Sequence, residues 1–545
     1  MTSVSPTTLA MAILIAFLAN AAILADKTLL IEDVGFAQAE SDVAKPFSVR
    51  VTLDARKPLH TIDPLIYGAS GVEPARAKVL GLSAVRWGGN RSSRYNWKTE
   101  ADNAGSDWFF LNGKAARWSD FVNNNRRAGL TSYLTVPMLP WVAKRPDGWS
   151  FSVAKYGPQK KVEPYMADRG DGTRPDGTPI TGNDPRETSV PATPEFQAAG
   201  IRALPRDPKR PMLYALDNEP MLWHATHRDV FPRGLSYDEC LDRGVALATA
   251  IKGADPAGLV AGPCTWGWTD LMYSAADAGS DNYRSHADHK AHGDKPFLAW
   301  YLGGMKSAST RAGKRLLDYV DVHFYPQGQV DGHMVNEGKS SHSREMRSLR
   351  LRSTRGLWDA SYRDESWIRE PVALIPRVRA WVAQENPGTK LVIGEYSWGG
   401  DDDASGAIAQ ADILGIFGRE NVDAAFYWAG LEGVQRFAFQ LYRNPDGSKH
   451  GFGDQALLCK SNTADRLAAF AALRDDGALT VVLVNKDLDR PAEVWLDTVD
   501  TKIRKSGGVI FRLPNPPGPI RKESLAADVA RIVVPPLSAA LIVRP

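Results

Sequence analysis

Between residues 64 and 430, short apolar runs rich in β-branched and aromatic residues alternate with longer stretches of helical periodicity. Eight of the runs have the length and composition of buried strands: PLIYG (64–68), SAVRWGG (83–89), TSYLTVPML (131–139), PMLYAL (211–216), LVAGP (259–263), YVDVHFYP (319–326), KLVIGEYSW (390–398) and VDAAFYWAG (422–430). Helices are expected between them, among others at 115–129, 237–253, 296–313, 368–385 and 406–420. Eight strand–helix units in series predict an α/β fold, a TIM-like (β/α)8 barrel.

After residue 440 the pattern changes to short strands separated by turns, with little helical periodicity. Examples are ALTVVLVNKDLD, AEVWLDT, GVIFRLP, ARIVVPP and AALIVRP, which together predict an additional β-sandwich domain. The segment FSVRVTLDA (47–55) precedes the first barrel strand and has no role in a barrel. We therefore predict a catalytic barrel at 61–437 and a sandwich assembled from 46–60 and 438–545.

The N-terminus carries an apolar stretch, LAMAILIAFLANAAILA (9–25), of the length found in secretory signal peptides. Small residues at 19–21 and 37–39 offer cleavage sites, but the preceding MTSVSPTT lacks the usual positive charge. We expect an exported protein, with residues 1–39 serving as a signal peptide or an N-terminal anchor, and membrane anchoring by residues 9–25 remains an alternative.

Composition narrows the choice of ligand. The 66 basic and 63 acidic side chains leave a net charge of +3, which gives no electrostatic reason to expect a nucleic acid or an anionic membrane as partner. Three widely spaced cysteines imply no disulfide framework. The sixteen tryptophans either pack the core or offer flat surfaces on which sugar rings can stack.

Polar and aromatic side chains cluster where the predicted barrel strands end. They are Arg86, Trp87 and Asn90 after the second strand, Asn218 and Glu219 after the fourth, His323 and Tyr325 at the sixth, Glu395 and Tyr396 at the seventh, and Trp428 at the eighth. One such ending would be an ordinary polar cap. Because the carboxyl ends of all barrel strands meet at one mouth, five of them together predict a shared reaction site.

Glu219 and Glu395 end strands that can face each other across this mouth. Two carboxyl groups so placed can cleave a glycosidic bond, one by protonating the leaving oxygen and the other by attacking the anomeric carbon or activating water. Donors such as Arg86 and Tyr325 would keep the second carboxylate charged. For either glutamate alone, a buried salt bridge is the alternative role.

Four blocks resemble glycoside hydrolase family 44, the endoglucanase and xyloglucanase family: VRWGGNRSSRYNWKTEADNAGSDWF (85–109), LDNEPMLWHATHRDVFP (216–232), RGLWDASYRDESWI (355–368) and GEYSWGGDDDASGAIAQADILGIFGRENVDAAFYW (394–428). The resemblance implies a retaining endo-β-1,4-glucanase acting on cellulosic β-glucan or xyloglucan. By motif match it implies Glu219 as general acid/base and Glu395 as nucleophile. It also implies a sandwich built from both chain ends.

Substrate contacts are predicted around this pair. Asn218 would bond the sugar 2-hydroxyl, with a turn cap as its alternative role. The other predicted binding residues are Arg86, His323, Tyr325 and four candidate stacking surfaces, Trp97, Trp358, Trp367 and Trp428, of which all but Trp428 could equally be packing residues. The long segments 144–210 and 327–366 follow strand ends, so we expect them to form the sides of an open groove that admits chain interiors.

No metal ligands are assigned. HADHKAHGD brings His286, Asp288, His289, His292 and Asp294 together at spacings that a metal could use, but a solvated loop is the favoured interpretation. The reaction requires no cofactor.

The resemblance allows a structural calcium ion, although Lys98 stands where an acidic residue is expected in relatives. We expect a β-1,4-linked polysaccharide substrate, a monomer, and no nucleic-acid or protein partner. A hydrolase of another β-1,4-linked hemicellulose such as xylan or mannan, and a catalytically silent polysaccharide-binding protein, remain as alternatives.

Overall fold

The computed structural model describes residues 44–545 except 340, 449–450, 499–506, 528 and 530. The predicted signal peptide or anchor at 1–39 lies outside the described residues. Within the described part of the chain, no helix is both long enough and apolar enough to cross a membrane.

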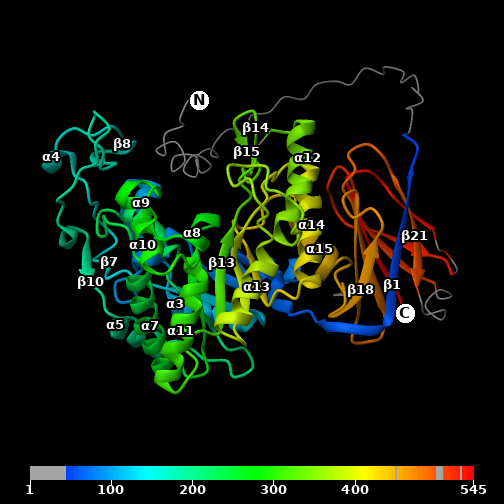
Figure 1. The fold of residues 1–545 in the computed structure, drawn as a ribbon, viewed down its shortest axis with the longest axis horizontal. Coiled ribbons are helices and arrows are strands. Elements are labelled where there is room, and N and C mark those ends of the chain that lie inside the picture. The colour runs from blue at the N-terminus through cyan, green and yellow to red at the C-terminus, as the bar shows by residue number, and fades with distance from the viewer. Residues whose placement is uncertain (1–43, 340, 449–450, 499–506, 528, 530) are drawn as a thin grey trace.

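A closed barrel of eight parallel strands forms the centre of the molecule (Figure 1). Around the barrel the strands follow the order β11 (Leu213–Leu216), β12 (Leu259–Thr265), β13 (Tyr319–Phe324), β16 (Lys390–Tyr396), β17 (Ala424–Tyr427), β2 (Gly68–Ser70), β3 (Ala84–Trp87) and β6 (Thr131–Val136). The predicted fold class is therefore confirmed. The first predicted strand is displaced, because Asp63 accepts a hydrogen bond from the Leu65 amide and Pro64 opens a 3-10 helix over Pro64–Tyr67.

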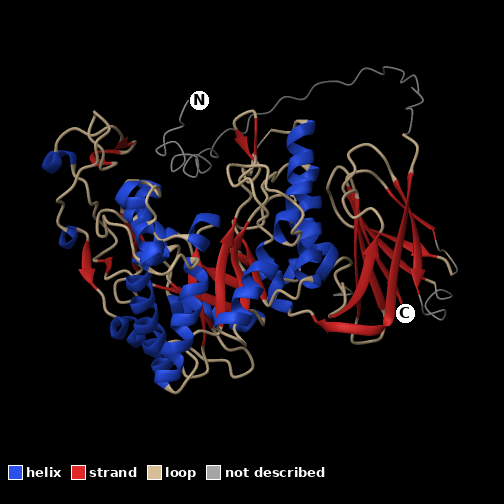
Figure 2. Cartoon of the chain, viewed as in Figure 1, coloured by secondary structure: helices blue, strands red, loops and turns tan. Residues whose placement is uncertain are grey.

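A helix follows each barrel strand and covers the outside of the barrel (Figure 2). These helices are α2 (Pro74–Leu80), α3 (Trp118–Ala128), α5 (Pro194–Arg202), α7 (Tyr237–Ala254), α11 (Phe297–Ala312), α13 (Leu374–Glu385), α14 (Ala404–Arg419) and α15 (Arg436–Arg443). Local capping defines their ends: Ser236 caps α7, Asp403 caps α14, and left-handed Gly129 and Gly313 end α3 and α11.

Two long excursions leave the barrel at strand ends and rise on the side toward which the strands point (Figure 1). One follows β6 and contains β7 (Trp141–Ala143), α4 (Val153–Tyr156), β8 (Val162–Glu163), β9 (Met166–Gly170) and β10 (Ser189–Pro191). The other follows β13 and contains β14 (Gln329–Val330), β15 (His333–Met334) and α12 (Arg344–Ser353). Smaller insertions contain β4 (Ala101–Asn103), β5 (Asn112–Lys114), α6 (Trp223–Thr226), α8 (Trp268–Met272), α9 (Ala275–Asp281) and α10 (Ala287–Ala291).

The remaining strands form one nine-stranded sheet beside the barrel (Figure 1). Its order is β23 (Arg521–Leu525), β22 (Gly508–Leu513), β25 (Ser538–Arg544), β20 (Leu479–Asn485), β19 (Leu467–Leu473), β18 (Gln455–Ser461), β1 (Phe47–Thr61), β21 (Ala492–Thr498) and β24 (Arg531–Val534). β1 pairs antiparallel with β18 and parallel with β21. Ile510 of β22 and Ile532 of β24, near opposite ends of this order, share one apolar core, so a single curled sheet produces the sandwich.

Helix α14 joins the barrel to this sheet. All of its residues except Arg419 are buried, because α12 and the barrel cover one side and β19, β20 and β25 the other. Any side chain at Gly415 would collide with the ring of Phe470 on β19. α15, which extends past the predicted barrel end at 437, packs on α14 and α2 and completes the helical layer.

Candidate active site

The turn after β11 aims the polar side chains of Asn218 and Glu219 into the barrel mouth. Asp217 and Glu219 both adopt left-handed backbone conformations (φ 72° and 47°), which are unfavourable for residues other than glycine. The buried Asp217 carboxylate holds the turn by accepting hydrogen bonds from the amides of Asn218 (2.7 Å) and Leu139 (3.1 Å) and from the Ser93 hydroxyl. Asp217 is not among the predicted site residues, although its place directly before Asn-Glu-Pro is a signal in the sequence.

Asn218 is fixed by contacts from the end of β3. Its Oδ1 accepts hydrogen bonds from Arg86 Nη2 (2.9 Å) and from the Gly89 amide (3.1 Å), and its Nδ2 donates to Asn90 Oδ1 (3.2 Å). With the oxygen held by two donors, the amide nitrogen is the part of Asn218 that a ligand hydroxyl can share with Asn90.

Glu395, at the end of β16, lies among positive and donor groups. Arg86 Nη1 is 2.5 Å from its Oε1, and the Tyr325 hydroxyl donates to its Oε2 over 2.9 Å. Burial acts to raise the pKa of Glu395, but the charges of His323 and Arg86, with the hydrogen bonds from Arg86 and Tyr325, outweigh it and hold the pKa below its usual value. Glu395 is therefore built to stay ionised.

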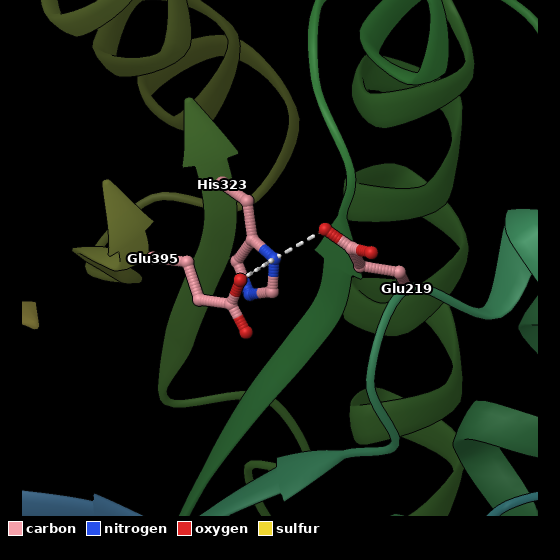
Figure 3. Close-up of side chains that lie close together, drawn as sticks. All are labelled: Glu219, His323 and Glu395. Atoms are coloured by element: carbon pink, nitrogen blue, oxygen red, sulfur yellow. Dashed lines mark hydrogen bonds and ion pairs between the residues drawn. The ribbon is translucent and has the colours of Figure 1, made fainter. Parts of the chain in front are cut away.

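Glu219 has the opposite bias. Burial, together with the negative charge of Glu395, raises its pKa against the lowering effect of a hydrogen bond from His323. His323 Nδ1 lies 2.9 Å from Glu219 Oε1 and 3.6 Å from Glu395 Oε2, so the imidazole bridges the two carboxylates (Figure 3). One oxygen of each carboxylate and a nitrogen of this histidine lie within 4.8 Å of one another.

Trp428, which follows β17, borders a groove that reaches Arg86, the partner of Glu395, but that neither glutamate lines. The Arg86 guanidinium carbon is 5.9 Å from the centre of the Trp428 ring, and a Cβ at Gly89 would lie 2.7 Å from that ring. The groove has a volume of about 480 Å³ and is lined among others by Ser70, Glu73, Val85, Trp87, Gly88, Asp120, Phe121, Asn124 and Gly430. A tryptophan face next to Arg86, which binds Glu395, suits the apolar face of a sugar ring.

The other three predicted tryptophans lie in different surroundings. Trp367 is 44 % exposed, and its Nε1 lies 3.4 Å from Oε1 of Gln327, two residues beyond Tyr325, so it stands near the mouth. Trp97 donates to the Phe196 carbonyl (2.9 Å), and its ring faces Gly200 of α5. The structure thus gives Trp97 a packing role.

The prediction that Trp358 is a stacking surface is wrong. Its ring lies 4.2 Å from the guanidinium of Arg419, the last residue of α14. α14 starts at the mouth, where Asp403 pairs with Arg347 of α12, and runs away from it. Trp358 therefore lies at the opposite end of the barrel, against Arg419, whose guanidinium carbon is also 5.7 Å from the ring of Phe470 on β19.

The histidine-rich segment is not a solvated loop. Residues 287–291 form α10, and the ring of His292 stacks on Tyr237 of α7 at 4.6 Å while His289 Nδ1 lies 2.9 Å from the Tyr237 hydroxyl. Asp277 accepts hydrogen bonds from the amides of residues 288 and 289. These contacts give the segment a structural role.

Glu219, His323 and Glu395 form the one group of three histidine, cysteine or acidic side chains, among the residues that the structure describes, with ligand atoms close enough for a metal ion. Arg86 at 2.5 Å from Glu395 would repel a cation there, so this group does not fit a metal. The optional calcium site stays a prediction.

Comparisons with known proteins agree with this geometry. The sequence profile of glycoside hydrolase family 44 matches residues 101–328. The chain is 30 % identical over 502 residues to endoglucanase A of Paenibacillus lautus, covering 85 % of this chain and 67 % of that protein. It is 29 % identical to the β-mannanase/endoglucanase A of Caldicellulosiruptor saccharolyticus, covering 83 % of this chain and 35 % of the longer relative.

Solved structures give the same result. CelM2, a bifunctional glucanase–xylanase from a metagenome library, superposes with a TM-score of 0.85 at 35 % identity, covering 91 % of this chain and 99 % of that one. A Paenibacillus polymyxa xyloglucanase of family 44 superposes with a TM-score of 0.75 at 28 % identity over 91 % and 99 % of the two chains. This chain is a glycoside hydrolase, and it belongs to glycoside hydrolase family 44.

Proposed function

We propose that this protein is a retaining endo-β-1,4-glucanase that cleaves cellulosic β-glucan or xyloglucan by double displacement. The observation that carries the proposal is the pair of carboxylates with oppositely shifted pKa values, one oxygen of each lying within 4.8 Å of the other. Retaining enzymes place their two carboxyl groups about 5 to 5.5 Å apart, whereas inverting enzymes leave about 6.5 to 9.5 Å for a water molecule. The short separation here favours direct attack by a carboxylate.

In the first step Glu219 acts as the acid and Glu395 as the nucleophile. Glu219 gives its proton to the glycosidic oxygen as the C–O bond breaks and its electron pair moves onto that oxygen. Glu395 attacks the anomeric carbon and forms a glycosyl ester. Asn218, held by Arg86, is placed to bond the 2-hydroxyl of the same sugar.

In the second step water, activated by Glu219, hydrolyses the glycosyl ester. Once Glu395 is esterified it is neutral, so the like charge that raises the pKa of Glu219 disappears. Glu219 can then remove a proton from water, which attacks the anomeric carbon and displaces Glu395. Two inversions at one carbon give overall retention.

The names of the relatives and the residues at the barrel mouth support the proposed substrate. Relatives are named as endoglucanase, xyloglucanase, glucanase–xylanase and β-mannanase, and all these activities address β-1,4-linked backbones. Trp428 and the exposed Trp367 are the proposed stacking surfaces, and the two excursions after β6 and β13 form the proposed sides of an open groove. Xylan and mannan stay as alternative substrates. A silent binder is disfavoured, since both carboxylates are present and oppositely biased.

Export is proposed with this function, because a polysaccharide outside the cell cannot cross the membrane to reach its hydrolase. The apolar run at 9–25 would act as signal or anchor. We retain the two-domain division at 61–437 and 46–60 with 438–545, the monomeric state and the lack of a cofactor requirement as parts of the same proposal.

The test is the configuration of the first product together with the choice of polymer. Carboxymethylcellulose, xyloglucan, xylan and glucomannan are digested side by side while viscosity, reducing ends and the anomeric proton signals are followed. We expect the β-anomer to appear first from glucan or xyloglucan, and viscosity to fall before much reducing sugar accumulates. An α-anomer appearing first would overturn the retaining mechanism, and release of small sugars in proportion to viscosity loss would overturn the endo mode.

A further inference from the structure

A buried carboxylate lies beneath the catalytic group. Asp321 is two residues before His323 on β13, so both side chains point into the barrel. Asp321 is fully buried, and its hydrogen-bond donors are uncharged: the Tyr133 hydroxyl, the Cys264 thiol and the Gly394 amide. The proposed mechanism uses none of these contacts, although a carboxylate in a barrel interior is costly unless it is fully hydrogen-bonded.

Both strands that flank β13 carry an extra residue beside Asp321. On β16 the register against β13 advances by two residues between Ile393 and Glu395 while β13 advances by one, which makes Gly394 a β-bulge. The Gly394 amide donates to Asp321 Oδ1 over 3.0 Å. Any side chain at position 394 would collide with this carboxylate, so the contact requires glycine.

The second bulge lies on β12. Its register against β13 passes directly from Pro263 to Thr265, which leaves Cys264 as the extra residue, with a left-handed backbone (φ 60°). The Cys264 thiol donates to Asp321 Oδ2 over 3.2 Å, and the Tyr133 hydroxyl donates to the same oxygen. Asp321 thus binds the extra residue of each neighbouring strand.

We propose that Asp321 is a positioning residue for Glu395, and this inference rests on the proposed role of Glu395 as nucleophile. By accepting from the Gly394 amide, Asp321 fixes the bulge that turns Glu395 toward Arg86, since bulges re-aim the side chains next to them. Without an acceptor, this buried amide would seek another partner and the bulge would shift.

The Asp321 carboxylate also supports Arg86, the ion-pair partner of Glu395. Tyr133, whose hydroxyl it binds, places its ring 5.7 Å from the Arg86 guanidinium carbon. A small displacement of reacting groups is costly, because misplacement by about 1 Å can reduce the rate of reaction about 100-fold. Asp321 acts on both Glu395 and Arg86 without contacting the substrate.

The test compares Asp321→Asn with Asp412→Asn. Asp412 is an equally buried aspartate that pairs with Lys486 far from the mouth, so it serves as the matched control. kcat and KM are measured on 4-nitrophenyl β-cellobioside, together with the melting temperature and the rate at which an activated 2-deoxy-2-fluoro-cellobioside labels the enzyme. Asn has a single acceptor oxygen, so it cannot accept from the Gly394 amide and also from the Tyr133 and Cys264 donors on its other side.

We expect Asp321→Asn to lower kcat and the labelling rate about 10- to 100-fold with KM changed less than about 3-fold. Asp412→Asn should lower the melting temperature and leave kcat within about 2-fold of wild type. If Asp321→Asn does not fold, Gly394→Ala breaks the same contact from the other side and should give the same fall in kcat.

Wild-type kcat and labelling rate in Asp321→Asn would overturn the positioning role, as would equal losses of kcat in Asp321→Asn and Asp412→Asn. These results differ from a failure of the proposed function, which would show as a wild-type enzyme that the fluorinated sugar does not label at Glu395.

Discussion

Two buried ion pairs in this molecule look alike and differ in what surrounds them. Arg86–Glu395 at the barrel mouth and Lys486–Asp412 between α14 and β20 span 2.5 Å and 3.1 Å, and in both pairs the side chains are at most 6 % exposed. Burial and distance therefore do not separate the proposed catalytic pair from the structural one. Both have the geometry of a well-formed buried salt bridge.

The two ion pairs differ in the residues that surround them. Asp412 accepts hydrogen bonds from the Thr354 hydroxyl (2.8 Å) and from Lys486. Together they form a local link between barrel and sheet. Glu395 shares its histidine with a second carboxylate, Glu219, whose pKa its charge helps to raise. The comparison indicates that the proposed chemistry lies where like charges are forced together at the barrel mouth, because that arrangement gives adjacent groups different protonation states.

The largest effect should come from Glu395→Gln. The amide keeps the shape but cannot form the glycosyl ester, so kcat should fall at least about 10,000-fold on polymer and aryl glycoside alike. Gln leaves the buried Arg86 without its counter-ion but also removes the repulsion with Glu219, so the melting temperature should change less than in the Lys486 variant below. Initial rates and calorimetry check both outcomes. Even an acid/base group contributes at least about 100-fold to the rate. Residual activity above about 1 % of wild type would therefore contradict the nucleophile role.

Lys486→Ala should do the reverse. It leaves Asp412 buried without its cation, which is expected to cost about 3 to 5 kcal/mol of unfolding free energy. kcat at 25 °C should stay within about 2-fold of wild type because the site is remote from the mouth. Denaturant unfolding and initial rates measure the two effects. The double variant Lys486→Met/Asp412→Leu is the control, since replacing both charges should restore most of the stability.

Trp428→Ala should have a smaller effect, confined to the mouth. Removing the ring that borders the groove is expected to lower kcat/KM by about 1 to 3 kcal/mol in transition-state terms, as one stacking surface is lost. Trp358→Ala is the matched control, because its ring lies at the far end of α14 and should affect stability alone. Equal kcat/KM values for the two variants would place the sugar elsewhere.

Tyr325→Phe should give the smallest change, visible in the pH profile. In the proposed mechanism activity needs Glu395 ionised and Glu219 protonated, so kcat/KM should rise with pH through the pKa of Glu395 and fall through that of Glu219. The Tyr325 hydrogen bond lowers the pKa of Glu395, so its loss should move the acidic limb upward by about one pH unit or less. An acidic limb that moves downward would contradict this assignment.

Much of the fold follows from the hydrophobic pattern. The eight apolar runs locate the barrel strands, since strands buried on both faces read as continuous apolar segments. The exception at Pro64–Tyr67 arises because the Asp63 cap and Pro64 favour a helical turn over strand pairing. The strand-end residues Arg86, Asn218 and Glu395 meet because parallel strands end on one side of the barrel.

The features that the sequence did not predict depend on the register of the strands and on the path of the chain between elements. Trp358 lies in a block that resembles the family, but its place depends on α12 running alongside α14 away from the mouth. Asp321 shares a strand face with His323, a signal that alternation offers, yet its contacts depend on bulges at Cys264 and Gly394 that only strand pairing shows.

The central claim, that Glu395 is the nucleophile of a double displacement, is tested most directly by covalent trapping. The enzyme is incubated with 2,4-dinitrophenyl 2-deoxy-2-fluoro-β-cellobioside and digested, and the labelled peptide is identified by mass spectrometry. We expect one sugar per chain, on the peptide that carries Glu395, with loss of activity that cellobiose reverses by transglycosylation. A label on Glu219, or no label on an enzyme that the same compound inhibits only competitively, would contradict the account.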